Sequence, residues 1–289
     1  MNQEPIITVS QDIYDDNGVL LISKGREFIL TNEKRKILSK CGKLDAILGL
    51  KDENDILNIE TQNEASSFSK VRSKTLSIIE QKLYEIKHRN KSISFDVLNK
   101  ATDIINYFVF NCKDKEWSRF ILILHSYVDW LYAHSINTAI ICYIIGSELG
   151  YNLTQLSNLC IAALLHDIGK TLLPKDVLIK RERLTDIEYA IIKNHSQMGS
   201  SLLQGCGLQP IVSQIVLQHH ERIDGSGYPN GLQKDEILEE SSILIAAEYL
   251  DTETTFRPYK NARPVDDVLY EMKLKDSVFP RYIVDILDS

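Results

Sequence analysis

The sequence TQLSNLCIAALLHDIGKTLLP, residues 154–174, decides the fold of the larger part of this chain. Thr154 is a residue type that caps helices, an apolar run follows it, and Gly169 stands where a helix would end. We therefore predict a helix over residues 154–166 that ends just before this glycine. His166 and Asp167 then lie side by side at the end of the helix.

Helix signals also follow this segment. Residues 185–188, Thr-Asp-Ile-Glu, form a capping box that opens a helix to about Gly205, and Pro210 opens another that ends near His219. From about Val71 onward the pattern is helical and clear strand alternation is scarce. The sequence therefore predicts a mainly α protein whose larger unit is all-α.

The first fifty residues carry strand signals instead. An apolar run ends at Tyr14, the turn Asp-Asp-Asn-Gly follows at 15–18, and a second apolar run occupies 19–22, a pattern typical of a hairpin. A short helix is expected over about 32–42 and a further strand over 44–50.

These signals divide the chain into three parts. Residues 51–70 are polar with little periodicity, which is typical of a connection between units. We therefore predict a small N-terminal α/β module over 1–55, a linker over 56–70 and a helical domain over 71–289.

Composition excludes several classes of protein. With 44% hydrophobic and 25% charged residues the chain is globular, and its 289 residues suit two units. A net charge of -7 argues against a nucleic acid polymer or an anionic membrane as partner, so an anionic substrate must meet local cations. Five scattered cysteines without a C-x-x-C pair, and no signal-peptide pattern, suit the cytoplasm. The apolar stretch 120–145 is interrupted by polar residues, so we expect a buried helix and no membrane span.

Histidine and carboxylate side chains gather in four patches. A lone histidine on an apolar helix is usually a core residue, but five of the seven histidines fall in these patches. Imidazole and carboxylate without thiolate suit iron, manganese, zinc or nickel better than calcium. We interpret the two other histidines, His88 and His125, as structural. The candidate ligands are His134, His166, Asp167, His195, His219 and His220.

Adjacent candidate ligands favour a pair of ions. Neighbours on a helix point about 100° apart, so His219 and His220 do not easily bind one ion. Asp167 could bridge two ions with its two oxygens while His166 holds one of them. Neighbouring ions are a recurrent device for hydrolysing phosphate esters. Lys170, one turn later and beside a flexible glycine, could reach a phosphate oxygen, although a solvated lysine is an equal alternative.

The loop after the histidine pair has a composition suited to ligand contact. Residues 224–229 read Asp-Gly-Ser-Gly-Tyr-Pro, in which the glycines allow close backbone approach and the proline stiffens the exit. An ordinary turn with an exposed tyrosine is the alternative.

Taken together, these segments resemble the HD-GYP family, a branch of the HD phosphohydrolases. The similarity covers about residues 115–289 and implies an all-α HD-type domain there; residues 1–50, in the small α/β module, are more faintly similar to a segment that often precedes such domains. The segments that resemble its two defining signatures are HDIGK at 166–170 and HHERIDGSGYPNG at 219–231. Further similarity lies in HSINTA at 134–139, LTDIEYAIIKNHSQMG at 184–199 and FRPYK at 256–260.

The resemblance implies a cytoplasmic metal-dependent phosphodiesterase that hydrolyses cyclic di-GMP to pGpG and onward to GMP. It implies iron or manganese in the site, so together with the donor chemistry we expect two divalent ions, iron or manganese before zinc or nickel. Carried over by position, the metal ligands are His134, His166, Asp167, His195, His219, His220 and Glu248, and the catalytic residues are Asp167 and Lys170. The groups that would meet the phosphates and guanine are Lys170, Gly227, Tyr228, Arg257 and Lys260.

This sequence departs from the family pattern at three positions. The family usually has an aspartate nine residues before the arginine of R-P-Y; that position here is Glu248, and Asp251, one turn later, is the alternative ligand. Some members bind a third ion through a glutamate four residues before the first histidine, where this chain has Trp130, so we expect two ions. Lys260 stands where the family often has arginine, which changes a bidentate phosphate contact into a point-charge one.

Three hypotheses of function stay open. In the leading one, a metal-bridged hydroxide attacks the phosphorus while Lys170 and the ions stabilise the developing charge. The second is a cyclic dinucleotide receptor whose turnover is weakened by Glu248, and the third is a phosphodiesterase that prefers cyclic GMP-AMP. The expected ligand is a cyclic dinucleotide, and a homodimer or signalling partner could engage the N-terminal module.

Overall fold

The computed structural model describes the helical part of the chain and four short strands before it. The described residues are 6–8, 13–14, 20–22, 27–29, 64–89, 93–112, 114–180, 182–256 and 260–289. The helices are α3 (Glu64–Arg89), α4 (Phe95–Asn106), α5 (Ser118–Tyr127), α6 (Asp129–Glu148), α7 (Leu153–Leu165), α8 (Lys175–Leu178), α9 (Asp186–Lys193), α10 (His195–Leu203), α11 (Pro210–Gln218), α12 (Glu239–Thr254), α13 (Val265–Leu274) and α14 (Arg281–Asp288). Three shorter helical turns are η1 (Tyr107–Asn111), η2 (Ile168–Leu172) and η3 (Lys234–Glu236). The mainly α fold is as predicted.

The four strands form two antiparallel pairs. β1 (Ile6–Thr8) pairs with β4 (Glu27–Ile29), and β2 (Ile13–Tyr14) pairs with β3 (Leu20–Ile22), which is the hairpin expected from the Asn-Gly turn. The helix expected over 32–42 and the strand over 44–50 lie outside the described residues. The small α/β module and the three-part division of the chain therefore stay predictions, although α3 already begins inside the expected linker.

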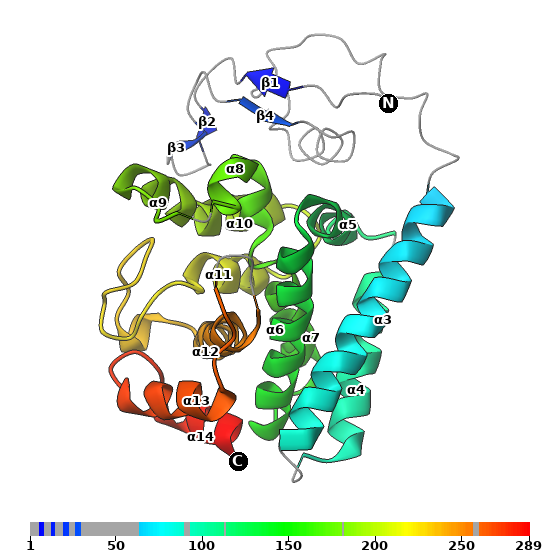
Figure 1. Ribbon diagram of the computed structural model, residues 1–289, viewed down its shortest axis with the longest axis vertical. Helices are drawn as coiled ribbons and strands as arrows, with labels where there is room; N and C mark the ends of the chain where they lie inside the picture. Colours follow the sequence, from blue (N-terminus) through cyan, green and yellow to red (C-terminus); the bar gives the residue numbers. More distant parts are fainter. Residues whose placement is uncertain are drawn as a thin grey trace.

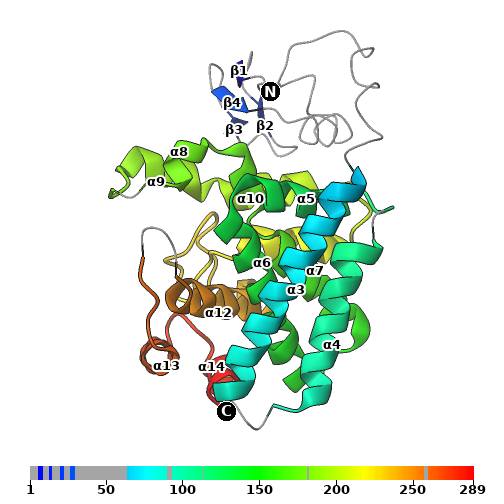
Figure 2. The same cartoon turned by 45° about the vertical axis from the view of Figure 1, so that its right-hand side comes forward.

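Helix α6 lies at the centre of the helical domain. It packs against α7 and α12 and also against α3, α4 and α5, and α3 and α4 run alongside it (Figures 1 and 2). Leu131, Ile136, Ile140 and Ile145 of α6 are fully buried. Because neighbours cover α6 on most sides, its sequence is apolar without a clear polar face.

The apolar stretch 120–145 forms two helices. Helix α5 ends at Tyr127, Val128 is extended with φ -146° and ψ 124°, and α6 begins at Asp129. The prediction of one continuous helix was wrong, because an apolar run carries little signal of where a buried helix breaks. Among the described residues, no helix is both long and apolar enough to span a membrane.

Helix α7 begins one residue earlier than predicted. Its N-cap is Asn152, whose Oδ1 accepts hydrogen bonds from the backbone N–H groups of Thr154 at 2.9 Å and Gln155 at 3.0 Å. The Gln155 side chain accepts in return from the Asn152 N–H at 3.1 Å, which completes a capping box. The helix ends at Leu165, one residue before the predicted end at His166, so His166 and Asp167 lie just beyond its last turn.

The capping box at Thr185 is also present. The Thr185 hydroxyl accepts from the Glu188 N–H at 3.2 Å, and the Glu188 carboxylate accepts from the Thr185 N–H at 2.8 Å. The single helix expected to reach Gly205 is wrong, however, because the chain breaks at Asn194 and α10 begins at His195. This break places His195 at the start of a helix that packs against η2 and α11.

Candidate metal centre

The structure brings all seven candidate ligands into one region of the helical domain. They lie in or directly after α6, α7, α10, α11 and α12, which are close to one another in Figures 1 and 2. All are buried except the half-buried His220. In chain order they are His134 in α6, His166 and Asp167 after α7, His195 at the start of α10, His219 and His220 after α11, and Glu248 in α12.

The candidate ligand atoms form two adjacent groups, and within each group they lie within 4.8 Å of one another. The rings of His166 and His219, one from each group, have centroids 5.1 Å apart. The first ligand group comprises Asp167, His195, His219 and His220, and the second comprises His134, His166 and Glu248.

Backbone carbonyl groups fix the orientation of three histidines. In each, Nδ1 lies 2.6–2.7 Å from the carbonyl oxygen three residues earlier: His166 with Ala163, His195 with Ile192, and His219 with Val216. Because a carbonyl oxygen only accepts, Nδ1 carries the hydrogen and Nε2 keeps its lone pair. Histidines that bind metals are oriented in this way.

The Nε2 atoms of these rings face one another. Nε2 of His195 lies 3.0 Å from Nε2 of His219 and 3.2 Å from Nε2 of His220. Lone pairs on His195 and His219 repel unless a cation lies between them. Metal–nitrogen bonds of about 2.0–2.1 Å place adjacent ligands of one ion roughly 3 Å apart, which matches this spacing. Nε2 of His166 is also buried and accepts no hydrogen bond. The residues therefore fit divalent cations.

Asp167 lies between the two groups. Its Oδ1 is 3.3 Å from Nε2 of His195, and its Oδ2 is 3.4 Å from Nε2 of His166 and 2.7 Å from Nζ of Lys170. Burial alone would raise the pKa of this carboxyl, but Lys170 and His166 hold it well below its usual value. Asp167 is therefore an ionised carboxylate whose two oxygens face different groups.

The histidines of the first group are held in the neutral form. Burial and the neighbouring imidazoles lower the pKa values of His219 and His220 well below the usual value, and burial with the nearby Lys170 lowers that of His195. For His166, burial opposes the charged form, but the Asp167 carboxylate outweighs it and raises the pKa. Neutral imidazoles can donate a lone pair to a cation, so the first group suits metal binding at neutral pH.

Gly169 allows two ligand-bearing segments to touch. A Cβ atom at this position would lie 2.0 Å from the carbonyl oxygen of His195 and 2.7 Å from the backbone nitrogen of Gly199. The backbone of η2 therefore packs directly against the backbone of α10, and this contact holds Asp167 near His195. Close packing therefore explains why residue 169 is a glycine, whereas the sequence analysis attributed this glycine to backbone flexibility.

Glu248 and Asp251 occupy different places. Glu248 belongs to the second group, and its Oε2 lies 3.7 Å from Nδ1 of His220. Asp251 is fully buried and its Oδ2 lies 2.7 Å from Nδ1 of His134, on the far side of that ring from Nε2. Of the two carboxylates, Glu248 is the one placed among the candidate ligand atoms.

Gly227 and Tyr228 lie in the loop that follows α11. The Tyr228 N–H donates to the carbonyl oxygen of His220 at 3.1 Å, and the two rings stack with centroids 4.7 Å apart. A Cβ atom on Gly227 would lie 2.4 Å from Cα of Glu221 and from the nitrogen of Arg222, so glycine lets the loop return onto its own start. Tyr228 therefore covers one side of the first ligand group.

Glu221 holds this loop in place, a role that the sequence interpretation missed. Its carboxylate is fully buried and accepts hydrogen bonds from the N–H groups of Asn230 at 2.7 Å and Leu232 at 2.9 Å. The sequence signal that could have indicated this role is the acidic residue directly after the histidine pair. These bonds, together with the one from Tyr228 to His220, tie the second half of the loop to the residues that follow α11.

Two of the three cations expected at the phosphates are described. Lys170 lies at the site: its Nζ is 2.7 Å from Oδ2 of Asp167, and 12% of its side chain is exposed. Lys260 pairs with Glu253, a carboxylate that Arg263 also contacts at 3.1 Å. Arg257 lies outside the described residues, so its phosphate contact stays a prediction.

The side chains interpreted as structural make ordinary packing contacts. His125 meets the ring of Tyr132 edge to face at 5.1 Å, and the exposed His88 stacks on Tyr84 at 5.6 Å. Trp130, where a third-ion glutamate would stand, packs against the apolar core. Among the described residues, neither ligand group contains His88, His125 or Trp130.

The sequence is similar to several curated proteins, and a model of the HD domain family matches residues 119–279. It is 36% identical over 145 residues to the 3'3'-cGAMP-specific phosphodiesterase 1 of Vibrio cholerae, covering 50% of this chain and 34% of that protein. It is 30% identical over 230 residues to a cyclic di-GMP phosphodiesterase of Thermotoga maritima, covering 78% and 57%. It is 36% identical over 147 residues to the cyclic di-GMP phosphodiesterase response regulator RpfG of Xanthomonas campestris, covering 50% and 39%. The chain thus spans between 34% and 57% of the length of these relatives.

A solved structure shares the fold. Bd1817, an HD-GYP-type protein from Bdellovibrio bacteriovorus, aligns with a TM-score of 0.50 and 15% sequence identity, covering 98% of this chain and 94% of that one. At this identity the likeness concerns the fold alone.

Proposed function

Because the chain belongs to the HD domain family and carries both signatures of its HD-GYP branch, we propose that it is a metal-dependent phosphodiesterase acting on a cyclic dinucleotide. One observation supports this above all: the two oxygens of Asp167 lie 3.3 Å from Nε2 of His195 and 3.4 Å from Nε2 of His166, atoms of different ligand groups. Two ions that share a carboxylate need this arrangement.

We assign two divalent ions to these groups, iron or manganese before zinc or nickel, because the donor set is imidazole and carboxylate. When bound, such ions activate water and polarise phosphate oxygens. The proposed ligands are His134, His166 and Glu248 for one ion, His195, His219 and His220 for the other, and Asp167 for both.

The surrounding side chains would bind and orient the substrate. Lys170 donates one hydrogen to Asp167 and has two more for a non-bridging phosphate oxygen, in surroundings where little water screens its charge. Burial raises the pKa of Tyr228, so its phenol stays a hydrogen-bond donor. We assign Tyr228 and Gly227 to the base, and Arg257 and Lys260 to the phosphates.

Cyclic di-GMP is the proposed substrate, with pGpG or GMP as the product, in the cytoplasm. The relative named a 3'3'-cGAMP-specific phosphodiesterase supports 3'3'-cGAMP as the second candidate. A receptor without efficient turnover is the third possibility, since Glu248 replaces the aspartate usual in the family.

Anaerobic purification with metal analysis tests these assignments. The protein is incubated separately with cyclic di-GMP and with 3'3'-cGAMP, and the products are separated by chromatography. We expect about two ions per chain and hydrolysis of cyclic di-GMP, with both lost in Asp167→Asn. Tight binding without product would indicate a receptor, and neither binding nor product would reject the proposal.

A further inference from the structure

A buried lysine on α3 reaches toward the proposed metal centre. Helix α3 lies before the matched residues 119–279 and runs alongside α6 (Figures 1 and 2). The other charged side chains of α3 from Val71 onward are exposed or half-buried, whereas Lys82 is 7% exposed. A buried ammonium is costly unless it is paired, so its partner is informative.

That partner is Asp251 of α12. Nζ of Lys82 donates to Oδ1 of Asp251 at 3.0 Å, and the Thr255 hydroxyl donates to the same oxygen at 2.9 Å. The second oxygen, Oδ2, lies 2.7 Å from Nδ1 of His134. Lys82, Asp251 and His134 thus form a continuous chain of contacts from α3 through α12 to α6.

We propose that Lys82 is a positioning residue for His134. By holding Oδ1 of Asp251 together with Thr255, Lys82 turns Oδ2 toward Nδ1 of His134, which leaves Nε2 for the ion. This inference rests on the proposed function, because that function makes His134 a ligand. Lys82 itself does not ligate, since an ammonium has no lone pair. Partners behind a histidine ligand typically tune metal affinity.

The charges support this role. Asp251 is fully buried, and among the described residues Lys82 is the lysine or arginine that pairs with its carboxylate. The nearest other carboxylate, that of Glu85, lies 3.9 Å from Nζ of Lys82 and is about half exposed. Asp251 is therefore the principal partner of Lys82, and Glu85 offers a control on the same helix.

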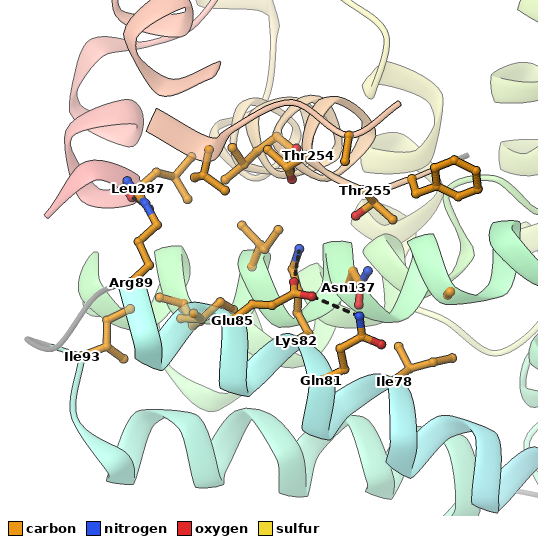
Figure 3. A pocket seen from close by; sticks show the side chains of 18 of the residues that line it. Ile78, Gln81, Lys82, Glu85, Arg89, Ile93, Asn137, Thr254, Thr255 and Leu287 are labelled. Atoms are coloured by element: carbon orange, nitrogen blue, oxygen red, sulfur yellow. Dashed lines mark hydrogen bonds and ion pairs between the residues drawn. The ribbon is translucent and has the colours of Figure 1, made fainter. Parts of the chain in front are cut away.

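A cavity of about 560 Å³ borders Lys82. It lies between α3, α6, α12 and α14, with Ile78, Asn137, Thr254 and Leu287 among its walls (Figure 3). Truncating Lys82 would extend this cavity toward Asp251. The space would then admit a small alkylamine, and its ammonium could replace the missing one.

The first test measures Mn²⁺ binding to the metal-free full chain by titration under electron paramagnetic resonance. Lys82→Met keeps most of the apolar side chain and removes the charge, so we expect Mn²⁺ affinity to fall by about 10–100-fold. Lys82→Arg should restore most of the affinity, and Glu85→Gln should bind as the wild type does.

The second test is chemical rescue of Lys82→Ala with n-propylamine. We expect the amine to raise the Mn²⁺ affinity of this variant and to leave the wild type and Asp251→Asn unchanged. Recovery would distinguish positioning from damage to the fold, because the amine supplies a charge and no covalent structure.

Wild-type affinity in Lys82→Met and Lys82→Ala overturns the inference, and so does a loss that neither arginine nor propylamine restores. A wild-type chain that binds Mn²⁺ and hydrolyses no cyclic dinucleotide contradicts the proposed function alone, and the Lys82 results then still decide the positioning role. A wild-type chain that binds no Mn²⁺ overturns both.

Discussion

The Cα atom of Gly169 faces the carbonyl oxygen of His195 so closely that a Cβ atom would lie 2.0 Å from that oxygen. Gly169→Ala must push η2 away from α10, so we expect the free energy of unfolding to fall by about 1–3 kcal/mol, with loss of bound metal. Denaturant unfolding and metal analysis measure both effects. Gly205→Asn is the control, because Gly205 has a φ of 79° that asparagine tolerates and open space around its Cβ position. Full metal content in Gly169→Ala would contradict the prediction.

Local features of this fold could be predicted from sequence, and non-local ones could not. The capping box at Thr185 and the helix start at Pro210 were found because each signal lies within a few residues. The break at Asn194 was missed because helical spacing continues across it. Lys82 and Asp251 lie 169 residues apart, and their contact depends on how α3 packs, so no local sequence pattern predicts it.

Glu248 is expected to complete one of the two ion sites. Glu248→Gln should lower the metal content by about one ion per chain, because an amide is a weaker ligand than a carboxylate, and should suppress turnover. Glu248→Asp should keep both ions. Elemental analysis and product formation check these outcomes against Glu240→Gln, two turns earlier in α12. Two ions bound in Glu248→Gln would remove Glu248 from the ligand set.

Glu221 is expected to act on the loop and not on the metal. The Gln side chain in Glu221→Gln has one acceptor oxygen, whereas the N–H groups of Asn230 and Leu232 each need one. One buried N–H group is left without its acceptor, so the free energy of unfolding should fall by about 1–3 kcal/mol. Thermal unfolding and metal analysis separate the two effects, with the exposed Asp224→Asn as the control. Metal loss from a folded Glu221→Gln would show that the carboxylate supports the ligands instead.

The stability of the metal-free protein should rise with pH between about 5 and 7. His195, His219 and His220 have lowered pKa values, so below about pH 6.5 the unfolded chain binds more protons than the folded one and stability is lost. The raised pKa of His166 has the opposite effect on stability, but we expect the three histidines with lowered pKa values to outweigh it. Denaturant unfolding at several pH values measures the slope, and His220→Gln should flatten it. A slope of the opposite sign would mean that the first group is not held neutral.

The contact between Lys82 and Asp251 limits where this protein can be shortened. A fragment that begins at residue 119 retains every candidate ligand, yet it lacks the buried Val71 and Ile79 and leaves the Asp251 carboxylate without its cation. An uncompensated charge in a dry interior typically destabilises a protein by about 3–5 kcal/mol, a large part of a domain's stability. We therefore expect that a fragment able to fold and to bind the proposed ions must include α3, well upstream of the segment by which the family is recognised.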